Sequence, residues 1–264
     1  MEERCPENFR QALIHLFPKP PKLGKQKDLR SQKNYRPISL LANFRKLYVA
    51  IISARVMKTV RLQKSQFGFL RGRSALDCIF LIREAILEAR YVGKWKKDGR
   101  NQKLYTAFLD LKAAFDRVIR EMLWRKLSNR FGIRGKLLRV IIDLFSRIKG
   151  RAVFNGMMTR WFSISTGILQ GSVLGPTLFI LFIDDLLEEL HKTNLGISFY
   201  NLILPVLAYA DDITLMALRA RELQKLLDIC SIWTFNNGMI FAVDKCIVVV
   251  FNSISKKTRR TLQF

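Results

Sequence analysis

The chain has 264 residues, of which 49% are hydrophobic, and its 46 Lys and Arg residues exceed its 21 Asp and Glu residues to give a formal net charge of +25. This length and apolar content exclude a disordered chain and allow one large domain or two closely joined subdomains. A charge surplus of this size favours a polyanionic partner, nucleic acid before membrane, because self-repulsion destabilises the compact state. Charge alone fits a purely electrostatic binder equally well.

The cysteines and the apolar runs narrow the class of protein further. Cys5, Cys78, Cys230 and Cys246 are scattered and form no C-x-x-C pair, so we expect neither a zinc cluster nor a disulfide framework. The N-terminal segment MEERCPENFR lacks the apolar region of a signal peptide. No apolar run reaches the roughly 18 residues of a membrane span. These features predict a protein of a reducing compartment, nuclear or cytoplasmic, that is neither secreted nor embedded in a membrane.

The first third of the chain is predicted to hold a basic arm and two helices. Residues 1–33 are polar and basic and contain PKPPKLGKQKD, which is typical of an extended arm and loop. From Asn43, apolar residues from Phe44 to Val56 recur at helical spacing, and this predicts an amphipathic helix with a basic opposite face. A second helix is expected from Ser74, a plausible N-cap, to about Arg90.

The rest of the chain alternates between strand and helix patterns. Residues 104–110 are expected to form a strand, 119–131 and 136–149 helices, and Asn155-Gly156 the turn of a hairpin. A Gly-rich turn then leads into a long apolar helix up to residue 192, on which Asp184 and Asp185 are interpreted as part of the polar face. Residues 219–235 look helical and 239–251 strand-like. The order predicts an α+β fold with an antiparallel sheet at its centre.

Two adjacent carboxylates occur inside an apolar run from Val206 to Leu218, VLAYADDITLMAL. Apolar residues alternate on both sides of them, which predicts a hairpin with Asp211 and Asp212 at or near its tip. Such a pair fits either a solvated turn or a divalent-metal site, because an ionised carboxylate is not stable in an apolar setting without a partner.

Asp110, at the end of an earlier predicted strand, could lie beside this hairpin and complete a cluster of carboxylates. Oxygen ligands without His or Cys match the preference of Mg²⁺, and two such ions can assist an in-line phosphoryl transfer. We expect Asp110 and Asp211 to be the bridging ligands. Adjacent strand residues point to opposite faces, so Asp212 is expected to join only if the turn rotates it inward.

Five segments together resemble a known family. FLDLKAAFD, GILQGSVLGP and YADD, in this order, resemble the core motifs of reverse transcriptases. NYRPISLLANFRK (34–46) and QFGFLRGRS resemble the fingers motifs of the LINE-type, non-long-terminal-repeat retrotransposon subfamily. The resemblance runs from about residue 18 to about residue 251.

The resemblance implies a right-hand polymerase, with a palm made of an antiparallel sheet backed by helices and with mostly helical fingers. It places the fingers at 34–103 and the palm at 104–251, with fingers-type elements returning at about 117–165. Residues 252–264 would be a basic tail or the start of a truncated thumb, so that the thumb is largely absent. The implied activity is RNA-directed DNA synthesis: deoxynucleoside triphosphates are added to a DNA primer 3′-hydroxyl on an RNA template, with two Mg²⁺ ions, or Mn²⁺ in their place.

The resemblance also assigns roles to single residues. The catalytic, metal-binding carboxylates are Asp110, Asp211 and Asp212. The nucleotide-binding residues are Phe115 as a steric gate, Arg36 and Lys245 near the phosphates, and Gln170 and Gly171 along the incoming nucleotide. The nucleic-acid contacts are Arg71, Arg73 and Tyr209. Asp116 fits the family's AFD pattern, but its position past the strand end suggests a structural or orienting role rather than that of a metal ligand.

Other readings of these residues stay open. Phe115 fits ordinary core packing as well as a gate, and Arg71 and Arg73 fit a solvated loop. The chain has Gly175 where the family pattern has Ser, and Ala242 where it commonly has Asn. Two alternatives to an active polymerase therefore stay open: a catalytically silent retrotransposon fragment that only binds nucleic acid, and a basic interaction scaffold.

Overall fold

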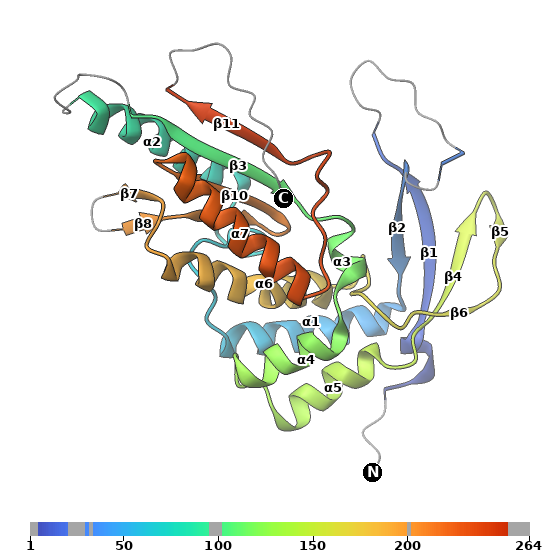
Figure 1. Ribbon diagram of the computed structural model, residues 1–264. Helices are drawn as coiled ribbons and strands as arrows, with labels where there is room; N and C mark the ends of the chain where they lie inside the picture. The colour runs from blue at the N-terminus through green and yellow to red at the C-terminus, as the bar shows by residue number, and fades with distance from the viewer. Residues whose placement is uncertain (1–4, 21–29, 32–33, 95–101, 200–201, 253–264) are drawn as a thin grey trace. The chain divides into compact units, whose positions relative to one another are not determined.

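The computed structural model describes residues 5–20, 30–31, 34–94, 102–199 and 202–252. The chain divides into two compact units (Figure 1), one made of residues 1–61 and 115–179 and the other of residues 62–114 and 180–264. Within the described residues, the helices are too short or too polar to cross a membrane. The proposed tail at 252–264 lies outside the described residues, apart from Asn252.

The first unit contains a sheet in the order β2-β1-β4-β5, with β6 also paired to β4. A short 3₁₀ helix, η1 (Glu7–Arg10), precedes β1 (Gln11–Pro18). Strand β1 lies between β2 (Tyr35–Leu40), to which it is antiparallel, and β4 (Lys149–Phe154), to which it is parallel. The arm predicted for residues 1–33 therefore includes a central strand, because segments distant in sequence supply the backbone partners that local composition does not reveal.

The predicted Asn-Gly hairpin is confirmed in the same sheet. Strand β4 continues into β5 (Met157–Met158), and β6 (Phe162–Ser163) returns to pair with the start of β4. Asn155 and Gly156 both have positive φ, 47° and 77°, as a two-residue type I′ turn requires.

Helices α1 (Asn43–Thr59) and α4 (Arg120–Asn129) begin and end close to the predicted positions. Helix α5 (Gly135–Phe145) ends before the predicted residue 149, where β4 begins, and the single turn α3 (Ala114–Arg117) was not predicted. The face that α1 buries differs from the prediction. Phe44 is 79% exposed and Leu47 is 63% exposed, whereas Arg45, a basic residue between them that the predicted pattern would leave in solvent, is buried. Helical spacing located the helix, but long-range packing selected the face.

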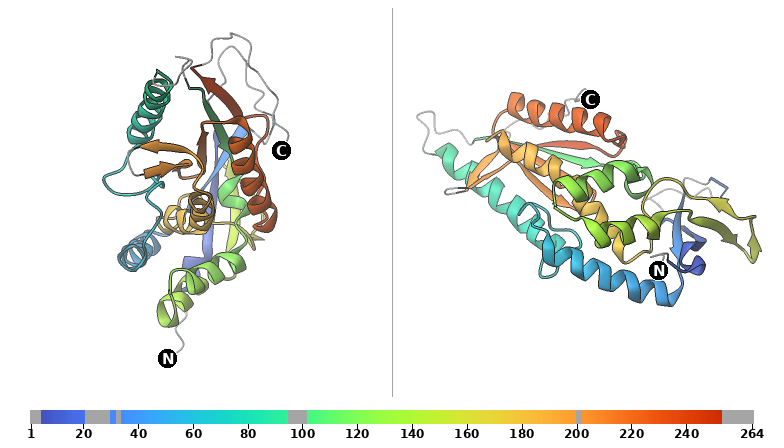
Figure 2. Two further views of the ribbon diagram at one scale, coloured as in Figure 1. Left: turned by 60° about the vertical axis from the view of Figure 1, so that its left-hand side comes forward. Right: turned by 90° about the horizontal axis from the view of Figure 1, so that it is seen from below.

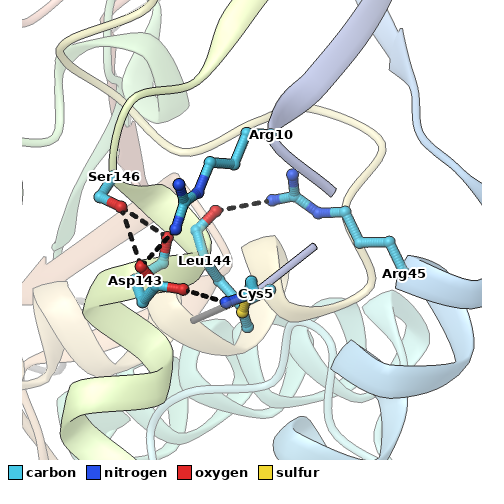
Figure 3. Close-up of polar contacts among 6 residues, drawn as sticks. All are labelled: Cys5, Arg10, Arg45, Asp143, Leu144 and Ser146. Carbon is cyan, nitrogen blue, oxygen red and sulfur yellow. Dashed lines mark hydrogen bonds and ion pairs between the residues drawn. The ribbon is translucent and has the colours of Figure 1, made fainter. Parts of the chain in front are cut away.

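Figure 3 shows why Arg45 can be buried. Its guanidinium donates to the carbonyl oxygen of Leu144 at 3.2 Å, as drawn in the figure. It also donates to the carbonyl oxygen of Phe9, which the figure does not include. On the same side of α5, Asp143 accepts hydrogen bonds from the Cys5 amide and from Arg10, both at 2.6 Å. Desolvation lowers the pKa of Arg45 to about 10, so the guanidinium stays charged at neutral pH. These contacts fix the N-terminal segment to α5.

The second unit is built on an antiparallel sheet in the order β11-β3-β10-β9, which confirms the predicted central sheet. Its strands are β3 (Leu104–Asp110), β9 (Val206–Tyr209), β10 (Asp212–Ala217) and β11 (Ile247–Phe251). A separate hairpin joins β7 (Ile197–Phe199) to β8 (Leu202–Leu204). Helices α2 (Ala75–Lys94) and α7 (Ala220–Asn236) pack on opposite faces of the four-stranded sheet (Figure 2).

Helix α6 (Leu174–Lys192) carries the two acids that were interpreted as its polar face. Asp184 is instead buried, 1% exposed, and accepts a hydrogen bond from the Gln63 amide at 2.7 Å. Asp185 accepts one from the indole N–H of Trp233 at 3.0 Å. Both acids are structural, as expected, but they hold neighbouring segments of the second unit rather than face water.

Candidate active site

Three carboxylates of the second unit gather at one end of its sheet. Asp212 begins β10 and stands opposite Asp110, the last residue of β3, in the antiparallel register. Opposite residues in such a pair share one face of the sheet. The two-residue turn of the hairpin is Ala210-Asp211, because Tyr209 pairs with Asp212. Asp212 therefore reaches the face of Asp110 without any rotation of the turn, contrary to expectation, and Asp211 is the carboxylate at the tip.

Lys245 adds a positive charge to this cluster. Its Nζ lies 2.5 Å from Oδ2 of Asp110, and the two side chains are 53% and 26% exposed. The segment before β11 brings the lysine there: the Ala242 amide donates to the Asp110 carbonyl at 2.8 Å, and the Lys245 amide donates to the Ala242 carbonyl at 2.8 Å. The hydrogen bond with Asp110 raises the pKa of Lys245, which is therefore charged at neutral pH.

The electrostatics of the cluster favour binding of a cation. Desolvation raises the pKa of Asp211, and the neighbouring Asp212 and Asp110 raise it further. Desolvation and Asp110 likewise raise the pKa of Asp212. Lys245 opposes both shifts. A group of acids whose pKa values are raised by mutual repulsion is stabilised in its ionised form by any added positive charge.

The donor set fits Mg²⁺ by its chemistry, since all the side-chain ligands would be carboxylate oxygens. Within the described ranges, however, no three Asp, Glu, His or Cys side chains are close enough together to form a complete metal site. Lys245 holds one oxygen of Asp110 in this arrangement.

The loop SQFGFLRGRS packs against the carboxylate hairpin. The Phe67 amide donates to the Ala208 carbonyl at 2.7 Å, and the Ala208 amide donates to the Ser65 carbonyl at 2.8 Å. Gln66, fully buried, accepts a hydrogen bond from the amide of Ala210 in the turn. Gln66 was not identified from the sequence, and the only available signal was its position directly before Phe67 in a recognised motif.

The three residues predicted to contact nucleic acid have different surroundings within the second unit. Arg73 donates to the carbonyl oxygens of Lys64 and Gln66, and its guanidinium lies 5.0 Å from the centre of the Phe67 ring. It therefore holds its own loop together. Arg71 is exposed on that loop, and Tyr209 is 39% exposed at the end of β9, next to the turn. The last two are accessible to a nucleic acid.

Apart from Lys245, which belongs to the second unit, the residues assigned to the nucleotide belong to the first unit. The Ser39 amide of β2 donates to the Gln170 carbonyl at 2.7 Å, which joins the strand carrying Arg36 to the Gln-Gly motif. Gly171 has a φ of 107°, and a Cβ there would lie 2.4 Å from the Ser39 carbonyl oxygen. Glycine is thus required at this position for two reasons: the positive φ disfavours a side chain, and β2 leaves no room for a Cβ. Arg36 is exposed on the same strand.

The side chain of Gln170 is oriented by Asp116. Its Nε2 donates to both carboxylate oxygens of Asp116, each at 3.2 Å. Desolvation raises the pKa of Asp116, and the Gln170 amide partly opposes this shift. This agrees with the orienting role expected of Asp116. Phe115, the preceding residue, is partly exposed and stacks on Phe179 with ring centres 4.7 Å apart.

Arg120 is a further residue that the sequence analysis did not identify. Its buried guanidinium donates to four carbonyl oxygens, those of Phe145, Ile164, Thr166 and Gly167, at 2.8 to 3.2 Å. The last three precede the Gln-Gly motif, so Arg120 fixes the segment that leads to it. A basic residue at a helix start gives no sequence signal for such a role.

The second unit also has a hollow of about 1,210 Å³, lined mainly by apolar residues of α2 and of the β7–β8 hairpin. None of the three carboxylates lines it. The candidate chemistry is therefore located by the carboxylates and not by this hollow.

Comparison with known proteins identifies the family. Residues 18–263 match the family model described as reverse transcriptase (RNA-dependent DNA polymerase). The chain is 29% identical over 225 residues to the Pol polyprotein of the type-1 retrotransposable element R2 of Popillia japonica, covering 81% of this chain and 30% of that protein. It is 30% identical over 193 residues to a probable RNA-directed DNA polymerase from transposon X-element of Drosophila melanogaster, covering 69% and 19%.

A solved structure supports the fold. Telomerase from Candida tropicalis, in complex with a fragment of telomeric RNA, aligns with a TM-score of 0.64 at 13% identity and covers 98% of this chain and 43% of that one. The α+β fold is thus that of the right-hand polymerases. The chain spans less than a third of the length of the two retrotransposon proteins. With five motifs in order and a family match over nearly its whole length, the chain belongs to the reverse transcriptase family, in the LINE-type retrotransposon group that its motifs resemble.

Proposed function

We propose that this chain carries the catalytic centre of an RNA-directed DNA polymerase, which adds deoxynucleotides to a primer 3′-hydroxyl on an RNA template. The observation that carries the proposal is the register that sets Asp212 opposite Asp110, with Asp211 in the adjoining turn and Lys245 on the Asp110 carboxylate. Three carboxylates and one cation at the end of a sheet suit the transfer of a highly charged nucleotide. A scaffold protein would have no need for this arrangement of like charges.

Asp110, Asp211 and Asp212 would hold two divalent ions, Mg²⁺ or Mn²⁺. When bound, these ions lower the pKa of the attacking hydroxyl and neutralise the leaving pyrophosphate. The strand register of the chain would hold the carboxylates in position, Lys245 favours the ionised forms of Asp211 and Asp212, and its ammonium would move from Asp110 to a phosphate oxygen. Lysine suits this role because it binds phosphate as a compact charge on a flexible chain.

The remaining assignments concern the substrate. Arg36 would bind the triphosphate, Gln170 and Gly171 would line the nucleotide, and Phe115 would exclude a ribose 2′-hydroxyl. Arg71 and Tyr209 are accessible for contact with template or primer. The excess of basic residues supplies the attraction to phosphate, and such binding weakens steeply as salt concentration rises.

Primer extension on an RNA template in the presence of Mg²⁺ tests the proposal. The chain should extend the primer, and Asp110→Asn or Asp212→Asn should lower the rate by roughly 10²-fold or more, since metal ligation contributes several kcal/mol to the transition state. Asp228→Asn is the matched control, because Asp228 is exposed on α7 and the substitution changes the net charge equally.

RNA binding separates this proposal from a catalytically silent fragment. The Asp→Asn variants should bind RNA at least as tightly as the parent, because they lose negative charge near the template. A parent chain that binds RNA but never extends the primer at high protein concentration would favour the silent fragment. Binding of RNA that does not respond to salt would contradict the electrostatic argument.

A further inference from the structure

We propose that Gln66 is a positioning residue for catalysis, which sets the carboxylate turn by holding the amide of Ala210. This inference rests on the proposed polymerase function. Gln66 lies outside the cluster of acids and lacks a charge, so it would act on the reaction only through the geometry of the hairpin between Tyr209 and Asp212.

The side chain of Gln66 accepts two hydrogen bonds through a single oxygen atom. Its Oε1 accepts from the Gly68 amide at 2.8 Å and from the Ala210 amide at 3.0 Å. Two converging donors require the amide oxygen at this point, so the orientation of the side chain is fixed by its partners. Gln66 is fully buried and Ala210 is 3% exposed, which keeps water from replacing the bond.

The turn that Gln66 contacts contains a residue in an unfavourable backbone conformation. Ala210 has a φ of 58°, a left-handed conformation that is unfavourable for a residue with a Cβ. Asp211 does not share this conformation. A strained residue keeps its conformation only where its surroundings hold it. The bond to Gln66 holds the Ala210 amide, and this peptide orientation determines where Asp211 and Asp212 project.

Gly68 restrains the same residue from a second direction. A Cβ at Gly68 would lie 2.2 Å from the backbone nitrogen of Ala210 and 2.9 Å from its Cβ. The loop backbone therefore lies directly against the turn, and only glycine permits this approach. Gln66 and Gly68, two residues apart in the loop, therefore both contact the backbone of Ala210.

The loop that carries Gln66 is itself anchored. Gln66 forms a parallel bridge with Ala208, and Arg73 donates to the Gln66 carbonyl. The Nε2 of Gln66 has no hydrogen-bond partner among the described residues. A buried donor without a partner is destabilising. An apolar side chain would avoid that penalty. The presence of an amide here is therefore explained by the two hydrogen bonds that its oxygen accepts.

The test compares Gln66→Met, which keeps the length but removes the acceptor, with Gln66→Glu, which keeps an acceptor oxygen. Primer extension is measured against Mg²⁺ and nucleotide concentration. In Gln66→Met we expect kcat to fall about tenfold, the effect of losing one buried hydrogen bond, and the Mg²⁺ concentration for half-maximal rate to rise. Gln66→Glu should restore part of the kcat and part of the parental Mg²⁺ dependence. The KM for template RNA should stay unchanged in both variants.

Gly68→Ala approaches the same turn without altering Gln66 and should raise the Mg²⁺ requirement in the same direction. Gly132→Ala is its control, because a Cβ added at Gly132 would meet no atom within 4 Å, although Gly132, unlike Gly68, has a positive φ of 66°. A purely structural role would lower the fraction of active protein and leave the Mg²⁺ requirement unchanged.

The outcomes distinguish this inference from the proposed function. If the parent chain does not extend the primer, the proposed function fails. If the parent is active and both Gln66→Met and Gly68→Ala keep its Mg²⁺ requirement, the positioning role of Gln66 is overturned. Should Gln66→Met fail to fold, the Mg²⁺ requirement of Gly68→Ala decides, with circular dichroism confirming that variant's folding.

Discussion

Asp110 and Asp212 stand opposite each other on neighbouring antiparallel strands, β3 and β10. Residues in this relationship have Cβ atoms roughly 4.5 to 5.5 Å apart, and like charges there are destabilising. Lys245 relieves part of the repulsion through its contact with Asp110, 2.5 Å long. The cluster is therefore a balance of one cation and three acids, and this balance leads to the first two predictions.

Removal of the cation should change the pH dependence of the reaction. Lys245 lowers the pKa values of Asp211 and Asp212, so Lys245→Met should raise both and keep the acids protonated to a higher pH. The acidic limb of the profile of kcat/KM against pH should shift to higher pH. Lys225→Met, at an exposed site on α7, is the control for net charge and should leave the limb in place.

Asp211, the carboxylate at the turn, should reduce the stability of the metal-free protein at neutral pH. Its pKa is raised above the ordinary value of 3.8 on folding, so the folded state binds protons more readily than the unfolded state. Asp211 therefore favours the folded state fully below pH 3.8, where its carboxyl group is protonated, and this contribution to stability is lost as pH rises through the folded-state pKa. Asp211→Asn should therefore raise the Tm at pH 7 without added metal, with little change at the lowest pH at which the chain stays folded.

Asp228→Asn provides the comparison for this measurement, since it makes the same change in net charge at an exposed site. Added Mg²⁺ should raise the Tm of the parent more than that of Asp211→Asn. Equal Tm changes for the two variants at pH 7 would contradict the local origin of the effect.

Phe115 should control the choice of sugar. Its ring is partly exposed and rests on Phe179, so Phe115→Val removes bulk at the surface without opening a deeply buried cavity. If the ring is the steric gate, the preference for deoxynucleotides over ribonucleotides should fall by at least about tenfold. Parallel single-nucleotide extension reactions measure it. Phe235→Ala, at a site that is 87% exposed, should keep the parental preference, and an unchanged preference in Phe115→Val would support the packing role alone.

Gly171→Ala should destabilise the first unit. The residue has a φ of 107°, and the added Cβ would lie 2.4 Å from the Ser39 carbonyl oxygen, so β2 and the Gln-Gly motif must separate. We expect a loss of about 1 to 3 kcal/mol in the free energy of unfolding by urea. Gly132→Ala, with positive φ but open surroundings, should lose about 1 kcal/mol, and an equal loss in both would rule out the contact with Ser39 as the main cause.

Arg120→Met should be among the most destabilising single changes in the first unit. It leaves four carbonyl oxygens without their donor, in a region that water does not replace readily. The expected loss is about 3 to 5 kcal/mol by chemical denaturation. Arg125→Met is matched to it on the same helix and is exposed, so its effect should stay within about 0.5 kcal/mol.

The sequence by itself determined the features that depend on local patterns. Alternation predicted β3 and the hairpin of β9 and β10, helical spacing predicted α1, and Asn155-Gly156 predicted its turn, because side-chain periodicity and positive φ are properties of a few consecutive residues. The motifs were sufficient to indicate the family that the comparisons then showed.

Only the tertiary structure decided which residues meet. Strand β1 required partners from distant segments, and Arg45 was buried by carbonyl groups far away in the sequence. The strand register placed Asp212 opposite Asp110, whereas the sequence pattern had favoured Asp211 as the partner of Asp110. Gln66 acquired its place at the turn through a contact across 144 positions of the chain. Local patterns contain no information on such pairings, since long-range register and packing are selected by the burial and hydrogen bonding of the whole unit.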